Sequence, residues 1–137
     1  MKKQNFLISI LIINFNNAKF IKRSINSCLR QTYKNFEILI YDDKSTDNSK
    51  LELNKYRKNK RIKIFFNKYK KKNVPAFDAM KGYLYLYKKS KGSIICLLDS
   101  DDYFHKKKIN EIRKIFEGKK NIQFIQNLPS IINNRKI

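Results

Sequence analysis

The chain has 137 residues, of which 42% are hydrophobic, and 32 lysines and arginines against 11 aspartates and glutamates give a net charge of +21. This length and apolar share predict one folded domain with its own core and exclude an intrinsically disordered chain. The basic residues are spread along the chain and form no single arm, so we expect no nucleic-acid partner. An anionic substrate or a membrane with anionic lipid fits the charge equally well.

The first half of the chain predicts two strands, each followed by a helix. Residues 6–13 form an apolar run with one serine, which is typical of a buried strand. From Ala18, apolar residues at three- and four-residue spacing indicate an amphipathic helix. These residues are Phe20, Ile21, Ile25, Cys28 and Leu29. Residues 36–41 predict the second strand. After the N-capping residues of 45–49, a second helix carries Leu51, Leu53 and Tyr56.

The second half continues the alternation. Residues 62–66 and 93–98 predict two more strands, the last one a continuous apolar run. A helix that begins at Val74 and stops before Gly92 lies between them, and it carries Phe77, Met80, Leu84 and Tyr87 around an internal Gly82. A final helix over 105–117, capped by Gly118, has Ile109, Ile112, Ile115 and Phe116 on one face.

This alternation of strands and helices indicates βαβ units, and hence an α/β fold with a mainly parallel central sheet. We assign residues 6–127 to one domain, which would include a short strand near 122–125, and residues 128–137 to a polar tail.

The cysteines and the N-terminus bear on the compartment. Cys28 and Cys96 lie far apart within apolar patterns, which indicates small buried residues in a reducing compartment. The basic start and the apolar residues 7–13 resemble a signal peptide, but asparagines follow without a small-residue cleavage site. No apolar run reaches the length of a transmembrane helix. We expect a cytoplasmic protein that associates peripherally with the inner face of the membrane.

Acidic residues are scarce, yet six of the eleven follow two predicted strands. They are Asp42, Asp43 and Asp47 after the second strand, and Asp99, Asp101 and Asp102 after the fourth. The carboxyl ends of parallel strands meet at one edge of a sheet, where α/β proteins bind ligands. Carboxylates this close repel unless a cation lies between them, and Mg²⁺ and Mn²⁺ prefer carboxylate and phosphate oxygens. We therefore predict a metal and phosphate site there, with a solvated acidic turn as the plainer alternative.

The order and spacing of four segments resemble the successive motifs of family 2 glycosyltransferases. The segments are 9–16, 27–37, 42–47 and 98–102, the last reading Leu98-Asp99-Ser100-Asp101-Asp102. The resemblance extends over residues 6 to about 117. It implies the GT-A fold, a Rossmann-like three-layer α/β/α arrangement, in its nucleotide-binding half.

The resemblance also implies roles for individual residues. Phe15 and Asn16 would border the nucleotide, and Asp43 would bond its base, usually uracil. Asp99 and Asp101 match the Asp-x-Asp motif, with Asp101 as the ligand of Mg²⁺ or Mn²⁺ and Asp99 nearer the ribose and diphosphate. The family transfers a sugar from a nucleotide-diphosphate sugar, usually with inversion, so we expect a glycan or lipid-linked acceptor and a role in cell-envelope polysaccharide synthesis.

The chain departs from the family pattern in two places. Residues 74–82 lack the Arg-Asn pair that often precedes the Asp-x-Asp strand, which leaves Lys72 or Lys81 to contact phosphate. The acceptor half with its usual catalytic base is not found, because only Glu111 and Glu117 follow Asp102 among the acids. We expect a truncated chain, leave the catalytic base unassigned, and expect binding of a nucleotide sugar with little transfer.

Three other interpretations stay open. One is a nucleotide-sugar-binding fragment without turnover. Another is a phosphoryl-transfer enzyme of the haloacid-dehalogenase type, whose signature strand also ends in Asp-x-Asp; there, however, Thr or Val would be expected at Tyr103. The third is a basic nucleic-acid-binding module, which leaves both acidic clusters unexplained.

Two further features are interpreted as structural. His105, the single histidine, is expected to be a surface residue at a helix start rather than a metal neighbour. The alternating tyrosines Tyr83, Tyr85 and Tyr87 are expected to serve packing and surface rather than a sugar platform.

Overall fold

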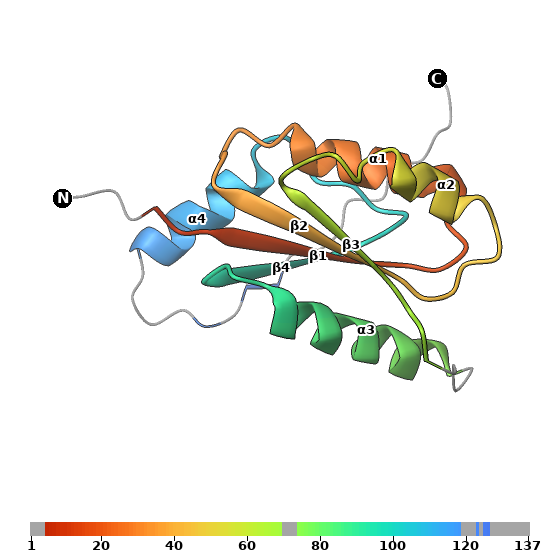
Figure 1. Ribbon diagram of the computed structural model, residues 1–137. Coiled ribbons are helices and arrows are strands. Elements are labelled where there is room, and N and C mark those ends of the chain that lie inside the picture. Colours follow the sequence, from red (N-terminus) through yellow and green to blue (C-terminus); the bar gives the residue numbers. More distant parts are fainter. Residues whose placement is uncertain (1–4, 70–73, 119–122, 124, 127–137) are drawn as a thin grey trace, which may run out of the picture.

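The computed structural model describes residues 5–69, 74–118, 123 and 125–126. Its elements alternate between strand and helix as predicted, which confirms the α/β class. They are β1 (Ile8–Asn14), α1 (Ala18–Leu29), β2 (Phe36–Asp42), α2 (Ser49–Asn54), β3 (Ile62–Phe66), α3 (Pro75–Lys89), β4 (Ile94–Asp99) and α4 (Lys108–Gly118). Helices α1, α2 and α4 lie on one face of the sheet and α3 lies on the other (Figure 1).

The four strands form one sheet in the order β3-β2-β1-β4, and every pair is parallel. β1 therefore lies between the two strands that end in acidic residues. Strands β1, β2 and β4 each extend one polar residue beyond the predicted apolar segment, to Asn14, Asp42 and Asp99. In the register, Asn14 pairs with Asp42 and Ile13 pairs with Asp99. The carboxyl ends of β1, β2 and β4 thus lie side by side.

Continuous apolar runs form the central strands because both of their faces are covered. On the side of α1, α2 and α4, a large cluster includes Ile10, Ile38 and Cys96. On the side of α3, a smaller cluster consists of Leu11, Leu39, Tyr41 and Leu86. Both cysteines are buried and neither forms a disulfide, as predicted.

Several apolar residues of α3 lie outside the buried core, although Leu86 is fully buried in it. Met80, Leu84 and Tyr87 are each about half exposed, and they line an open apolar groove of about 420 Å³ beside β4. Gly82 is buried instead, because a Cβ there would lie 2.8 Å from Ile13 Cδ1. The helix is continuous through this glycine, and the missing side chain lets α3 approach the sheet closely.

The last helix begins three residues later than predicted. The segment before it bonds to the end of α1: the Thr32 amide donates to the Lys106 carbonyl, and the Ile109 amide donates to Gln31 Oε1. These contacts replace the first helical turn expected from His105. Residues 122 and 124 of the short predicted strand, and the tail over 128–137, lie outside the described residues.

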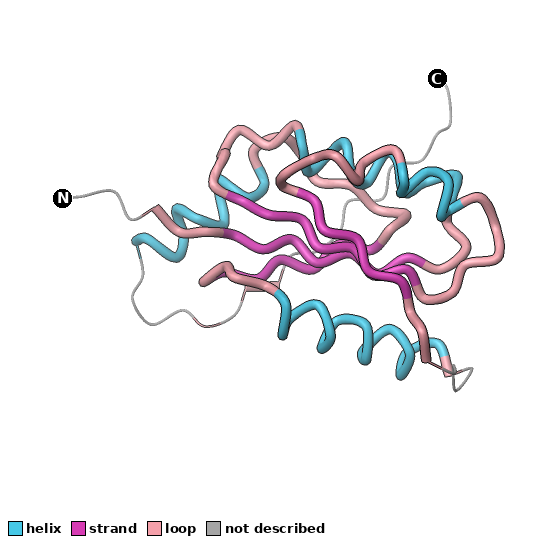
Figure 2. Tube along the Cα trace, viewed as in Figure 1, coloured by secondary structure: helices cyan, strands magenta, loops and turns pink. Residues whose placement is uncertain are grey.

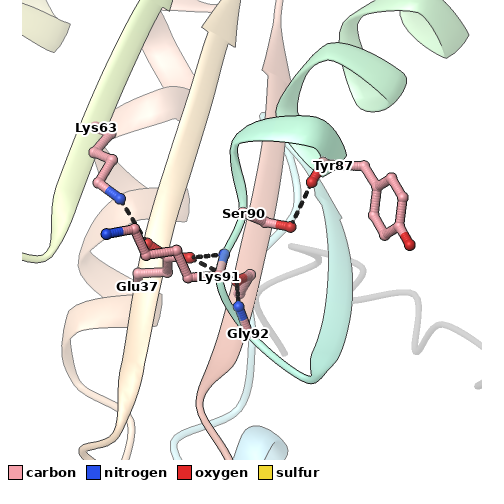
Figure 3. Close-up of polar contacts among 7 residues, drawn as sticks. Glu37, Lys63, Tyr87, Ser90, Lys91 and Gly92 are labelled. Carbon is pink, nitrogen blue, oxygen red and sulfur yellow. Dashed lines mark hydrogen bonds and ion pairs between the residues drawn. The ribbon is translucent and has the colours of Figure 1, made fainter.

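A buried polar cluster fastens the connection between α3 and β4 to the sheet (Figure 3). Glu37 Oε1 accepts from Ser9 Oγ at 2.8 Å and from the Lys91 amide at 2.6 Å, while its Oε2 pairs with Lys63 Nζ at 2.8 Å. The Gly92 amide donates in turn to Ser9 Oγ at 2.8 Å. Burial alone would raise the pKa of Glu37, but these donors outweigh it and lower the pKa below its ordinary value.

Candidate functional site

The two acidic clusters predicted from the sequence do meet at one edge of the sheet. Asp42 and Asp99 end the strands on either side of β1, and the parallel register holds both ends level. The loops that follow β1 and β2 lie next to each other at this edge (Figure 2). The expectation that Asp43 and Asp99 share one edge is therefore confirmed.

Asp42 organises the loop after β2. Its carboxylate is 3% exposed and accepts from the Ser45 amide at 3.0 Å, from Ser45 Oγ at 2.7 Å and from Asn14 Nδ2 at 2.8 Å. A buried charge is stable only with such partners. Three donors already surround Asp42, which suits it to hold the loop shape rather than to meet a ligand.

The Phe15–Asn16 loop is tied to the same loop. Asn16 has φ 52°, a left-handed conformation that asparagine tolerates well, and its Oδ1 accepts from the Thr46 amide at 2.7 Å. The Asn16 amide donates to Ser45 Oγ at 2.9 Å. Phe15 is 47% exposed beside it. Phe15 and Asn16 therefore present one exposed ring and a fixed backbone at the edge where the sequence predicted them.

Asp47 belongs to the start of α1 rather than to the open edge. Its Oδ2 accepts from the Ala18 amide at 2.9 Å and its Oδ1 accepts from the Ser49 amide at 2.9 Å. Partial burial would raise the pKa of Asp47, but the hydrogen bonds from Ser49 and Ala18 outweigh it and lower the pKa. Asp47 therefore caps the first amides of two helices, as carboxylates at helix N-termini do.

A polar cleft of about 200 Å³ opens beside Asp43. The Asp43 side chain is 4% exposed, and its Oδ1 accepts from Asn67 Nδ2 at 2.6 Å. The residues that line the cleft are Tyr41, Asp43, Asn67, Tyr69, Asp78, Lys81 and Tyr85. Burial, reinforced by the negative charge of Asp43, raises the pKa of Tyr41 to about 12. The cleft thus offers a carboxylate, an amide and aromatic rings to a planar polar ligand.

Asn67 and Asp78 are among the lining residues that the sequence did not single out. Asn67 directly follows β3, so the rule that singled out the acids after β2 and β4 could have found it. Asp78 lies on α3 and is 7% exposed. A carboxylate among apolar helix residues was its only sequence signal. Of the two lysines proposed for phosphate, Lys81 lines the cleft and Lys72 lies outside the described residues.

The Asp99–Asp101 turn is held from both sides of the sheet. On the α1 side, Asn17 Nδ2 donates to Ser100 Oγ at 2.7 Å and Arg23 Nη2 donates to the Asp101 carbonyl at 2.6 Å. On the α3 side, the Tyr83 hydroxyl donates to Asp99 Oδ1 at 2.9 Å. The side chains of Asp99 and Asp101 remain exposed, so both carboxylates are open to a ligand.

The tyrosines of α3 divide between two roles. Tyr85 packs its ring against Tyr41 and Phe65, with centroids 5.3 and 5.4 Å away, so the packing prediction is confirmed for it. Tyr83 also packs against the core beneath α3, as predicted, and in addition its hydroxyl donates to Asp99. Burial and the adjacent Asp99 charge raise the pKa of Tyr83, which keeps it a hydrogen-bond donor at neutral pH.

The donor set at the turn suits a hard divalent cation. Within the described residues, no three His, Cys, Asp or Glu side chains gather as a metal-binding group. Mg²⁺, however, is commonly held by one or two carboxylates together with water and substrate phosphates. The exposed oxygens of Asp99 and Asp101 fit that pattern. His105 is exposed in the turn before α4, in agreement with its expected surface role.

The two acids of the last helix lie away from this edge. Glu111 and Glu117 are on α4, whose start bonds to the end of α1 at the opposite edge of the sheet (Figure 1). Glu117 pairs there with Arg113 at 2.6 Å. Across the part of the chain that the structure describes, no helix is both long and apolar enough to span a bilayer.

Comparison with known proteins gives consistent matches over most of the chain. The profile of a family described as Glycosyl transferase family 2 matches residues 9–136. The Escherichia coli protein WfgD, a UDP-Glc:alpha-D-GlcNAc-diphosphoundecaprenol beta-1,3-glucosyltransferase, is 35% identical over 97% of this chain and 49% of its own. WfaP of Escherichia coli, which carries the same enzyme name, is 39% identical over 83% of this chain and 43% of its own.

The fold has a solved counterpart. The crystal structure of S. aureus TarS 1-349 in complex with UDP matches with a TM-score of 0.71 and 25% identity, over 81% of this chain and 32% of that chain. The match confirms the expected α/β fold of the GT-A type. The chain spans about half the length, or less, of the relatives it matches.

Proposed function

Because this chain belongs to glycosyl transferase family 2, we propose that it binds a UDP-sugar at the carboxyl edge of its sheet and serves transfer of the sugar to an acceptor hydroxyl. One observation carries the proposal. The polar cleft at Asp43 and the exposed carboxylates of Asp99 and Asp101 flank the end of β1, so one extended ligand can meet both.

Different residues of the site contact different parts of the nucleotide. Asp43 lies in the cleft, where its carboxylate accepts a hydrogen bond from an N–H of the base, and uracil carries such a group. Phe15 and Asn16 border the nucleotide on the neighbouring loop. Two UDP-glucose transferases among the relatives support UDP as the carrier.

The diphosphate of the nucleotide sugar lies at the Asp99–Asp101 turn. Asp101, assisted by Asp99, would hold Mg²⁺ or Mn²⁺, which when bound supplies neutralisation of the charge on the departing diphosphate. Arg23 and Asn17 keep the turn in place through its backbone and Ser100. The protein thus holds the turn that carries the Asp99 and Asp101 carboxylates before the ligand binds, which lowers the entropy cost of ordering them on binding.

The acceptor is proposed to be a glycan or a lipid-linked sugar, with transfer by inversion at the anomeric carbon. The diphosphoundecaprenol acceptor in the relatives' name supports a lipid-linked molecule and a role in envelope polysaccharide synthesis. The charge of +21 would favour encounter with an anionic membrane from the cytoplasmic side. The catalytic base stays unassigned.

Calorimetry of UDP binding tests the proposal. Wild-type protein should bind UDP in Mn²⁺ and lose most of that affinity in EDTA. Asp101→Ala should weaken binding in Mn²⁺ by at least roughly 100-fold, because losing one of few metal ligands should cost no less than losing a partner that supports one. Asp43→Ala should weaken it by about tenfold, the value of one hydrogen bond to a charged group.

Glu111→Ala provides the matched control. It also removes an exposed carboxylate, but on α4 at the far edge of the sheet, so UDP affinity should not change. Equal UDP affinity in Mn²⁺ and EDTA would remove the metal role of Asp101. Metal-dependent binding without transfer to any acceptor would favour the alternative of a nucleotide-sugar-binding module.

A further inference from the structure

The contact between Tyr83 and Asp99 joins α3 to the acidic turn across the face of the sheet opposite α1. We propose that Tyr83 is a positioning residue that fixes the orientation of the Asp99 carboxylate for the metal-bound diphosphate. This inference rests on the proposed function and adds a residue that no sequence motif marks.

Asp99 needs such a partner because of its place in the fold. It is the last residue of β4, an edge strand, and its side chain is exposed. The terminal torsion of an aspartate is broad, so an exposed carboxylate samples many orientations. A donor 2.9 Å from Oδ1 selects one of them and leaves lone pairs on both oxygens for a ligand.

Tyr83 is suited to this task because its own position is fixed. Its ring packs against the cluster of Leu11, Leu39, Tyr41 and Leu86 beneath α3. The neighbouring Gly82 lets the helix approach the sheet closely enough for the hydroxyl to reach the strand end. A tyrosine has few rotatable bonds, so holding it costs little conformational entropy.

The contacts around the turn separate two tasks. Asn17 bonds the Ser100 side chain and Arg23 bonds the Asp101 carbonyl, so the α1 side holds the path of the turn. Tyr83 bonds the Asp99 carboxylate itself. Removing the Tyr83 hydroxyl should therefore leave the backbone of the turn in place and free only the orientation of the Asp99 carboxylate. A carboxylate with no fixed orientation should bind the metal more weakly, so a higher metal concentration should be needed to fill the site.

The test is the Mn²⁺ concentration that gives half-maximal UDP binding, measured with the whole chain by calorimetry and by the electron paramagnetic resonance signal of free Mn²⁺. Tyr83→Phe removes the hydroxyl and keeps the ring. We expect this midpoint to rise roughly tenfold, as when a supporting partner of a metal ligand is lost. Excess Mn²⁺ should restore wild-type UDP binding, which it would not do for a misfolded site.

Two controls isolate the hydroxyl. Tyr87→Phe removes a hydroxyl from the same helix, where the ring is 59% exposed, and should leave the midpoint unchanged. In an Asp99→Ala background, which removes the acceptor of this hydrogen bond, Tyr83→Phe should add little, since the two residues act through one contact. Thermal unfolding of each variant checks that the fold is retained.

The outcomes separate the two levels of the proposal. If the UDP affinity of the wild-type protein did not depend on Mn²⁺, both the proposed function and this inference would be overturned. Metal-dependent wild-type binding with an unchanged midpoint in Tyr83→Phe would overturn the positioning role alone. If Tyr83→Phe raised the midpoint equally with and without the Asp99→Ala change, the positioning role would also be overturned.

Discussion

Gly92→Ala should be one of the most damaging single substitutions in this chain. A Cβ at position 92 would lie 2.6 Å from both the amide nitrogen and Oγ of Ser9, and 2.8 Å from the Leu7 carbonyl oxygen. Two of these three atoms belong to the backbone of β1 or the residue just before it, which side-chain rotation cannot move. The connection from α3 into β4 must therefore shift away from the sheet.

The loss in the free energy of unfolding can be estimated from the hydrogen bonds that such a shift breaks. The Gly92 amide would lose its bond to Ser9 Oγ, worth about 1 kcal/mol, and the Lys91 amide would lose its bond to the Glu37 carboxylate, worth about 2 kcal/mol. We expect a loss of about 3 kcal/mol from a total stability of roughly 5–15 kcal/mol. The variant should fold, but with a loosened β4.

Urea unfolding followed by circular dichroism measures this loss. With a slope of about 2 kcal/mol per molar urea, the midpoint should fall by roughly 1.5 M. Gly118→Ala is the matched control, because a Cβ there meets no atom of the described chain within 4 Å and alanine favours the helix by up to about 1 kcal/mol. A Gly92→Ala midpoint equal to that of the wild type would refute the close packing against Ser9.

Two further predictions concern ionisable groups. Glu37→Gln should cost about 2 kcal/mol at pH 7, because its carboxylate pairs with Lys63 and accepts from Ser9. The folded pKa of Glu37 lies below its ordinary 4.5, so this stability is present above pH 4.5 and lost as pH falls through the folded pKa. Urea midpoints of the two proteins should converge as the pH falls from 4.5 through the folded pKa of Glu37, and a gap that does not narrow with falling pH would contradict the assignment. Burial raises the pKa of Cys28 to about 12 and of Cys96 to about 11. Both thiols should react with Ellman's reagent at pH 8 more than roughly 100-fold more slowly in the folded than in the urea-unfolded chain, and fast labelling of the folded protein would show that they are accessible.

Much of the fold follows from local pattern. The four strands lie where apolar segments predict them, and the two central strands are apolar almost throughout because both of their faces are covered. The alternation with helices makes the sheet parallel, and a parallel sheet brings the residues after Asn14, Asp42 and Asp99 to one edge. The sheet edge that carries these acids was therefore predictable, whereas the roles assigned to Asp43, Asp99 and Asp101 stay predictions.

Local pattern was less informative about α3. The sequence predicted a helix with apolar residues at helical spacing and did not say which side meets the sheet. In the structure Gly82 lies close against the sheet, while Met80 and Leu84 line an open groove. Spacing reports which residues share one side of a helix. It does not report which side meets the sheet when a buried glycine and an apolar stripe compete for it.

By itself the sequence determined the order of the elements, the sheet edge that carries the acids and the family motifs. Only the tertiary structure decided which side chains meet there: Asn67 beside Asp43, Tyr83 on Asp99, and Asp42 enclosed by its own loop. The reason is physical. Strand and helix periodicity depends on near neighbours in the chain, whereas a hydrogen bond between α3 and β4 depends on how closely two packed elements approach, and that distance is set by side chains from both.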